Sequence, residues 1–460
     1  MAYGRTMFPD SPTDRPDTVP LITAALVLAS AVACGLIVPS VFWAALAASI
    51  VAGIALLAFR HPTGFCVAWL LLAGMSLEMA LHDLAGDELF QPVIAVVKGL
   101  GIVLAILCAL RFGPRLDVFS PAWTYVAMLA IGLIHGLYPG LTAADSVRSC
   151  IGSAAPFAFG LCRPPRDWAN AIIRATAWCP LAAVAAAIPL AVGGIRPLFV
   201  DSGGARLAGL GHPAFLAGVC LPAIYACLIL LYRHGRRGDL ILLGVNFLIL
   251  ILTGARAPLT YGLAVTGLSL LSIRSCVFPL RWRLSLVLGT AAALPALLLV
   301  AADLSDFRLF NVVLHQAGNL SGRDLLWPQF EAAAAQSPWF GWGVGAGNAI
   351  IPPSGPIARL LGTWAAHNEY LRMEVEGGQI GCAALITMFA AWVTVHTRGL
   401  CRSDRRIMRL AFVGFACHAV TDNVLISTPA CVLFTFAIAV FASVTSAPSR
   451  LVLPDSRRRA

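Results

Sequence analysis

Apolar runs of roughly twenty residues recur along almost the whole chain, and they constrain its fold more than any other feature. A helix of that length crosses the ~30 Å hydrocarbon core of a bilayer, and backbone groups in lipid must find their partners within the segment. Only 12% of the 460 residues are charged and 59% are hydrophobic, whereas soluble domains carry about twice that charged fraction. The sequence therefore predicts an all-α, polytopic integral membrane protein.

Windows of about 19 residues indicate about fourteen transmembrane helices. The polar segment before the first span, and the second span directly after it, argue against a cleaved signal peptide. The span with the most polar residues is the one at 143–162. The predicted spans lie near residues 20–38, 41–59, 64–82, 92–110, 120–137, 143–162, 170–192, 212–232, 239–254, 257–273, 284–302, 377–396, 408–424 and 429–446.

The net charge of +10 comes from arginine clusters that fall in alternate loops. This is the positive-inside pattern, with both termini cytoplasmic, so the charge indicates topology and contact with membrane lipids rather than nucleic acid. The thirteen cysteines include no C-x-x-C, and neither a zinc nor a redox framework is predicted. We expect a disordered cytoplasmic tail (1–19), transmembrane helices 1–11 (20–301), a long outer loop carrying short amphipathic helices (302–376), transmembrane helices 12–14 (377–446) and a basic cytoplasmic tail (447–460).

A few isolated arginines stand on the outer side, against the positive-inside pattern. Arg206 comes shortly before one span, and Arg256 lies between two spans with almost no loop. An arginine at such a depth is costly without an anionic partner. It could form a structural ion pair or reach the headgroups, or its guanidinium could bind phosphate or pyrophosphate with two hydrogen bonds.

The long outer loop contains several local signals. Ser321 is predicted to be the N-cap of a short amphipathic helix over 325–335. Glycine at every second position over 341–347 lacks the strand–turn–helix setting of a nucleotide-binding loop, so we expect close approach of the backbone to another segment or a ligand.

A second helix is predicted through 357–376, directly before a span. Helical spacing would place Thr363, His367, Tyr370 and Glu374 on one polar face. The side chains of Glu369, Arg372 and Glu376 would share another face. An imidazole has the unperturbed pKa that best suits a general base near neutral pH, which makes His367 the leading catalytic candidate.

In their order and spacing, four blocks resemble the O-antigen ligase and polymerase superfamily of bacterial envelope glycosyltransferases. The resemblance covers about 200 to 425. The blocks are Leu252-Thr-Gly-Ala-Arg256-Ala-Pro, Ser321-Gly-Arg323-Asp-Leu-Leu-Trp327, Pro338-Trp-Phe-Gly-Trp-Gly-Val-Gly345, and His367-Asn-Glu-Tyr-Leu371 followed by Glu376-Gly-Gly-Gln-Ile-Gly381.

The resemblance implies glycan transfer from an undecaprenyl-diphosphate donor to a sugar hydroxyl on the periplasmic face of the bacterial inner membrane, without metal, nucleotide sugar or other cofactor. Arg206 and Arg256 would hold the diphosphate, with Arg323 as a further candidate. His367 would deprotonate or orient the acceptor, and Glu369 and Glu374 are alternative bases or orient His367. Residues of the same block are expected to contact substrate, namely Asn368, Tyr370 and Arg372.

The number of spans favours a polymerase of exopolysaccharide or O-antigen repeats over a ligase that transfers the glycan to lipid A–core. A chain-length regulator or other polysaccharide-assembly protein would be a partner of such a polymerase. A lipid-linked oligosaccharide flippase and a multi-span oligosaccharyltransferase are the rival functions, disfavoured by the lack of an internal repeat and by the short first outer loop. Asp422 and Asn423 are either a helix-end cap or part of an acceptor site.

Overall fold

The computed structural model describes residues 53–77, 87–201, 203–275, 277–299, 306–309, 322–361 and 363–443. The chain divides into two units, Met1–Pro62 and Thr63–Ala460. The described part of the first unit contains the helix Gly53–Arg60. The predicted tails at 1–19 and 447–460, the span at 20–38 and the proposed cap Ser321 lie outside the described residues.

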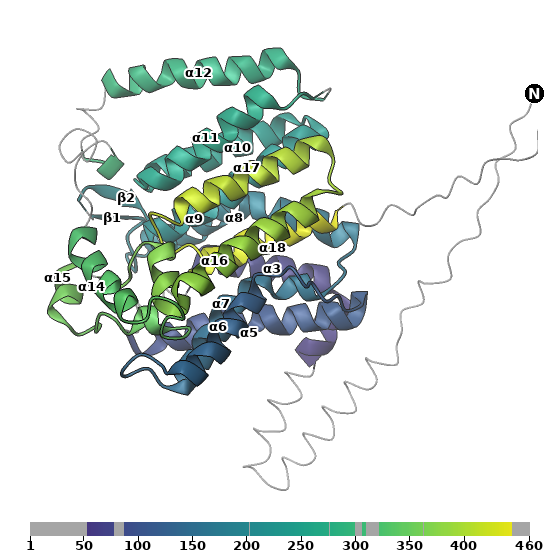
Figure 1. Cartoon of the computed structure of the whole chain (residues 1–460). Helices are drawn as coiled ribbons and strands as arrows, with labels where there is room; N and C mark the ends of the chain where they lie inside the picture. The colour runs from purple at the N-terminus through teal and green to yellow at the C-terminus, as the bar shows by residue number, and fades with distance from the viewer. Residues whose placement is uncertain are drawn as a thin grey trace, which may run out of the picture. The chain divides into compact units, whose positions relative to one another are not determined.

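The second unit is built almost wholly of helices (Figure 1). From residue 62 onwards, the long apolar helices overlap the predicted spans, whereas α14, η2 and α15 lie within the predicted outer loop. The helices are α3 (Pro62–Met75), α5 (Asp87–Phe112), α6 (Ala122–His135), α7 (Ala143–Ala154), η1 (Ala155–Leu161), α8 (Arg166–Val192), α9 (Pro213–His234), α10 (Arg237–Leu252), α11 (Arg256–Ser272), α12 (Leu280–Leu299), α14 (Arg323–Gln336), η2 (Ala346–Asn348), α15 (Pro356–Leu361), α16 (Glu369–Thr397), α17 (Arg402–His418) and α18 (Thr428–Ala442).

Four described helices are long and apolar enough to cross a membrane, or five if the helices on either side of His61 are counted together. The four are Val93–Phe112, Arg166–Val192, Pro213–His234 and Glu369–Thr397. The polytopic helical class is thereby confirmed, whereas the total of fourteen spans remains a prediction.

Helix α9 forms the centre of the unit and packs against α8, α10, α11, α17 and α18. It is apolar on all sides, and nearly every residue from Leu216 to Tyr232 is buried, as expected of a helix surrounded by other helices. Gly218 lets α18 approach closely, because a Cβ at this position would lie 3.2 Å from Pro429 Cβ. This core fixes the helix ends on which the site residues stand.

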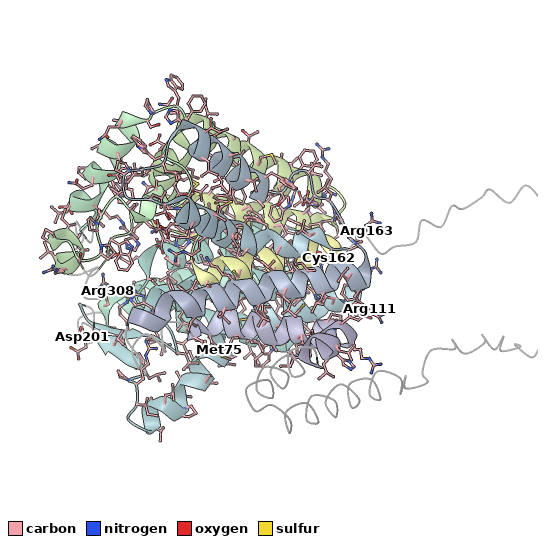
Figure 2. All side chains as sticks on the ribbon, turned by 90° about the horizontal axis from the view of Figure 1, so that it is seen from below. Met75, Arg111, Cys162, Arg163, Asp201 and Arg308 are labelled. Carbon is pink, nitrogen blue, oxygen red and sulfur yellow. The ribbon has the colours of Figure 1, made fainter. Side chains whose placement is uncertain are left out.

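The two ends of the helices differ in character. At one end, Arg233 forms an ion pair with Asp404 at 2.8 Å, and Arg406 donates to Ser272 O at 2.6 Å, so several predicted cytoplasmic loops meet there. Figure 2 shows Arg111 and Arg163 at this end and Asp201 and Arg308 at the opposite end. The alternation of arginine clusters along the sequence thus becomes a separation of the two ends in space.

Three local predictions are corrected. A short antiparallel hairpin, β1 (Phe199–Asp201) and β2 (Ala205–Leu207), is an exception to the all-α prediction. The N-cap of α14 is Gly322 in a left-handed conformation, not Ser321. The apolar segment at 143–162 is divided into α7 and the 3₁₀ helix η1, which has Pro156 in its first turn.

The continuous helix predicted over 357–376 is also wrong, since α15 ends at Leu361 and α16 begins at Glu369. His367 has φ +48°, which is incompatible with a right-handed helix. The Asn368 side chain then accepts hydrogen bonds from the backbone N–H groups of Tyr370 and Leu371 and starts a new helix. The polar face predicted for Thr363, His367, Tyr370 and Glu374 therefore does not exist.

The glycine-rich segment lies directly against α16, which confirms the predicted close backbone approach. Trp342 N–H and Gly343 N–H donate to the carbonyls of Val375 and Glu376 at 2.8 and 2.9 Å. The helix is broken at Gly378, with φ +61° and ψ −168°. A Cβ there would lie 2.3 Å from the Trp339 carbonyl carbon, so only glycine fits this crossing.

Candidate functional site

A cavity of about 1490 Å³ lies in the second unit, between helices α5, α7, α9, α16 and α18 and the loops that join them. It brings together charged residues that are far apart in the sequence. Among the described residues, five cationic and two acidic side chains line it, which favours an anionic ligand. They are Lys98, Arg148, Arg206, Arg308, Arg372, Glu376 and Asp422.

His367 stands in this cavity between two polar partners. Its Nδ1 lies 3.2 Å from Asp422 Oδ1, and its Nε2 lies 3.2 Å from Thr363 Oγ1. The carboxylate can only accept, so we assign the proton to Nδ1, which leaves the Nε2 lone pair to accept from the threonine hydroxyl. His367 and Asp422 are each about one-third exposed, at 35% and 34%. The pair thus has the arrangement of a base held by a carboxylate.

The loop between α17 and α18 positions Asp422. Glu369 N–H at the start of α16 donates to Ala419 O at 2.7 Å, and this bond holds the loop beside His367. Burial raises the pKa of Asp422, but the hydrogen bond and charge of His367, together with His418, outweigh it and lower the pKa overall. Asp422 is therefore a carboxylate at neutral pH.

Arg206 and Arg308 form the cationic wall of the cavity. The hairpin carries Arg206, whose Nε donates to Thr253 O at 2.8 Å, and Ala205 N–H bonds to Asp306 O at 2.7 Å beside Arg308. Burial and the neighbouring Arg308 charge lower the pKa of Arg206 to about 10. Two partly desolvated cations held side by side are expected to bind an anion strongly.

Two further predicted arginines adjoin this wall. Arg256 is the first residue of α11. The pKa of Arg308 is lowered by the burial of Arg308 itself and by the charge of the neighbouring Arg256. Arg323 donates to Thr421 O at 2.7 Å, next to Asp422. Burial lowers the pKa of Arg323. The charge of Asp422 raises this pKa, and the charge of Arg256 lowers it further. Both arginines thus lie within electrostatic range of residues that line the cavity.

The remaining predicted site residues lie at the start of α16. Arg372 is buried between Glu369 and Glu376, with its NH1 2.9 Å from Glu376 Oε1. Glu369 is therefore paired with Arg372 and not with His367. Tyr370 donates from its hydroxyl to Ala416 O at 3.0 Å. Glu374 is half-buried on α16 and, like Asn368 and Tyr370, is not among the residues lining the cavity.

Three cavity residues were missed as site residues in the sequence. Arg308 lies in the long outer loop, and His212 caps α9 through its Nδ1, which accepts from Ala214 N–H at 3.2 Å. Lys98 is 8% exposed and stands within the apolar helix α5. An ionisable residue within an apolar span was the available signal for Lys98. Within the described ranges, no group of three His, Cys, Asp or Glu side chains is arranged to hold a metal ion.

The fold and the site define a class: a helical membrane protein with a cationic cavity that contains an imidazole–carboxylate pair. Residues 240–386 match the family model for O-antigen ligase, which supports the resemblance of this part of the chain to the O-antigen ligase and polymerase superfamily. The matched segment contains Arg256, Arg308, Arg323 and His367, whereas Arg206 and Asp422 lie outside it. A comparison with curated proteins gave no match. The family supports glycosyltransferase activity of the ligase or polymerase type.

Proposed function

We propose that the protein transfers a glycan from an undecaprenyl-diphosphate donor to a sugar hydroxyl at the periplasmic face of the inner membrane. The observation that carries this proposal is the placement of His367, held by Asp422, in the same cavity as Arg206 and Arg308. Glycosyl transfer needs a base for the acceptor and positive charge for the departing diphosphate. The cavity supplies both.

On the acceptor side, His367 Nε2 is the base. The Thr363 hydroxyl now occupies the place at 3.2 Å that an acceptor hydroxyl would take. The acceptor oxygen attacks the anomeric carbon, its proton passes to Nε2, and the bond from that carbon to the diphosphate oxygen breaks. Asp422 stabilises the imidazolium that forms and keeps the ring oriented.

On the donor side, Arg206 and Arg308 bind the diphosphate. The leaving group gains negative charge as the glycosidic bond breaks, so cations fixed beforehand stabilise the transition state more than the ground state. The Thr253 carbonyl fixes the Arg206 guanidinium, and the bond from Ala205 in the hairpin to Asp306 O fixes the backbone beside Arg308. Arg256 and Arg323 add to the positive potential around it.

Polymerisation of exopolysaccharide or O-antigen repeats is our first choice of reaction, based on the predicted number of spans. Transfer to lipid A–core is the alternative, favoured by the description of the matched family. The periplasmic position of the site is supported by the arginine-rich loops at the opposite end of the helices.

The test uses the full chain in lipid nanodiscs with an undecaprenyl-diphosphate-linked repeat and, separately, lipid A–core as second substrate. A ladder of lipid-linked chains on a gel would identify a polymerase. A single shifted lipid A–core species would identify a ligase. If neither product forms while the lipid-linked substrate crosses the membrane of reconstituted vesicles, the protein is a flippase and the proposal is wrong.

The cationic wall has its own test in the same assay. Arg308→Gln should raise the KM for the donor about tenfold or more, since a charge-assisted hydrogen bond contributes about 1.5–3 kcal/mol. Arg359→Gln is the matched control, because Arg359 is exposed on α15 and bonds Ser354 O. Equal donor KM values in the two variants would remove Arg308 from the site.

A further inference from the structure

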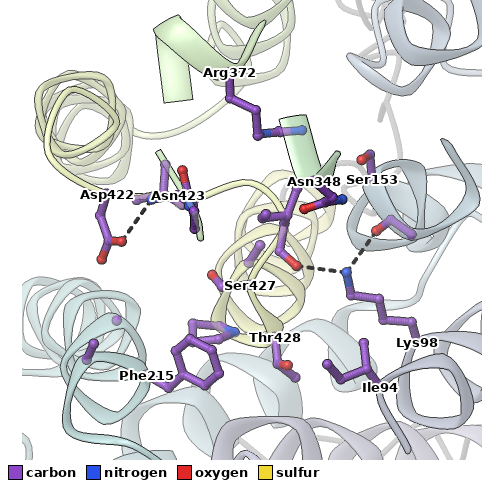
Figure 3. A pocket seen from close by; sticks show the side chains of 18 of the residues that line it. Ile94, Lys98, Ser153, Phe215, Asn348, Arg372, Asp422, Asn423, Ser427 and Thr428 are labelled. Carbon is purple, nitrogen blue, oxygen red and sulfur yellow. Dashed lines mark hydrogen bonds between the residues drawn. The ribbon is translucent and has the colours of Figure 1, made fainter. Parts of the chain in front are cut away.

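The chain contains one lysine among its 32 basic residues, and this lysine lines the cavity. Lys98 stands in the apolar helix α5, away from the loops where the arginines cluster. Its Nζ donates to Ile426 O at 2.8 Å and to Gly152 O at 3.1 Å. These bonds hold the ammonium group at the junction of α5, α7 and the loop before α18. Figure 3 shows this part of the pocket, with Ser153 and Asn348 on the same side as Lys98.

The part of the cavity beside Lys98 differs chemically from the cationic wall of Arg206 and Arg308. Two residues that line the cavity, Asn423 and Glu376, each have one buried acceptor oxygen without a hydrogen-bond partner within the described structure, Oδ1 and Oε2 respectively. Asn423 is 9% exposed and Glu376 is fully buried. Buried polar atoms are nearly always hydrogen-bonded, so two unpartnered acceptors beside a cavity indicate a ligand with hydrogen-bond donors.

The same region has apolar walls. Ile94 on α5 and Phe215 on α9 line the pocket, and Figure 3 shows them below the polar groups. A sugar ring matches this combination, because its hydroxyls can donate to Asn423 and Glu376 and accept from Lys98 while its C–H faces contact apolar side chains. A diphosphate matches it less well, since it offers no hydrogen-bond donors to the two acceptors.

We propose that the region bounded by Lys98, Asn423, Glu376 and Phe215 is a saccharide subsite, and that it holds the acceptor glycan with its hydroxyl toward His367. The inference rests on the proposed glycosyl transfer for the role of the sugar as acceptor. The division of the cavity follows from the chemistry of its walls: Arg206 and Arg308 on the donor side, and on the acceptor side Lys98, Asn423 and Glu376, whose other oxygen is paired with Arg372.

Binding is tested without turnover, through the melting temperature of the full chain in nanodiscs. The probes are inorganic pyrophosphate and the glycan released by mild acid from the host's own lipid-linked repeat. Both should raise the Tm of the wild type. Asn423→Leu and Phe215→Leu should lose the response to glycan and keep that to pyrophosphate, and Arg206→Gln should show the reverse. No glycan response in the wild type, or an unchanged response in the first two variants, would overturn the subsite.

Kinetics give the second test. Asn423→Leu and Lys98→Met should raise the KM for the acceptor about tenfold while the donor KM stays unchanged. If Lys98→Met does not fold, Asn423→Leu and Phe215→Leu decide the outcome. Transfer with an unchanged acceptor KM in those variants would refute the subsite and leave the proposed function intact. A wild type that responds to glycan in the Tm assay but transfers nothing would refute the proposed function and leave the subsite.

Discussion

At the scale of single residues, the site depends on pairings between segments that are distant in the sequence. His367 and Asp422 are 55 positions apart, and they meet because the loop after α17 bonds to the first N–H of α16. The carboxylate fixes which imidazole nitrogen carries the proton. Loss of the Asp422 carboxylate should therefore lower kcat without weakening the binding of the donor in the cavity.

We expect Asp422→Asn to lower kcat by about 10²–10⁴-fold, because an amide can hold His367 in the wrong tautomer and cannot stabilise the imidazolium. His367→Ala should cost at least as much. Both variants should keep the donor KM of the wild type. Glu331→Gln, at an exposed position on α14, is the control and should be fully active. An Asp422→Asn enzyme with normal kcat would show that the carboxylate is only structural.

Part of the site could be predicted from residue types alone. An isolated outer arginine and a histidine among carboxylates are unusual enough in an apolar chain to mark Arg206 and His367. The partner of His367 could not be found in this way, because Glu369 and Glu374 are adjacent in sequence while Asp422 is adjacent only in space. Glu369 is instead the counter-ion of the buried Arg372 side chain.

At the scale of elements, backbone geometry shapes the site as much as side chains do. The segment 338–346 crosses α16 at its break, and its backbone is bonded to the helix through Val375 and Glu376. This crossing fixes the helix turn that carries Arg372 and Glu376, both of which line the cavity.

Gly378→Ala should destabilise the protein by about 2 kcal/mol or more, because the position has φ +61° and the new Cβ would meet the Trp339 backbone. Gly267→Ala is the matched control. A Cβ at Gly267 meets nothing within 4 Å, and the change within α11 should be neutral or stabilising by up to about 1 kcal/mol. Thermal unfolding in detergent measures both. Equal Tm values would show that the crossing tolerates a side chain.

The cap of α9 gives a pH dependence. Partial desolvation beside the cavity and the nearby Arg206 charge lower the pKa of His212 to about 4, from an ordinary value of 6.5. The fold thus favours the neutral ring, which accepts the Ala214 N–H bond. This contribution to stability is complete above pH 6.5 and is lost as the pH falls through 4.

The wild type should therefore lose Tm between pH 6.5 and 4 more steeply than His212→Asn, since asparagine can cap without titrating. Unfolding curves across this range make the comparison. Parallel pH profiles in the two proteins would mean that the ring does not act as the cap.

The long apolar helices could be located from the sequence, because an apolar run long enough to cross a membrane has few alternatives to a helix. The segment 357–376 could not, because its periodicity is helical throughout. The left-handed turn at His367 and the cap at Asn368 divide it, and they are stabilised by tertiary contacts such as the bond from Glu369 to Ala419.

At the scale of the whole second unit, the arginine-rich loops and the site occupy opposite ends of the helices. This separation predicts which surface each end faces. Cys401 is exposed beside Arg402 at the arginine-rich end, and Leu360 is exposed on α15 at the other end, where it could be replaced by cysteine.

In a variant lacking the other cysteines, Leu360→Cys should react with a membrane-impermeant maleimide from the periplasmic side, and Cys401 only in inverted vesicles. Mass spectrometry of the labelled peptides distinguishes the two. Labelling in the opposite sense would place the site in the cytoplasm and exclude a periplasmic donor.

The single lysine has a practical consequence. Apart from the α-amino group, Lys98 carries the only primary amine of the chain, and it lines the cavity. An amine-directed fluorophore or cross-linker of suitable size would therefore attach at one place inside the cavity. The protein thus has a built-in reporter position, which would allow occupancy of the cavity to be followed in the native sequence, without an engineered label.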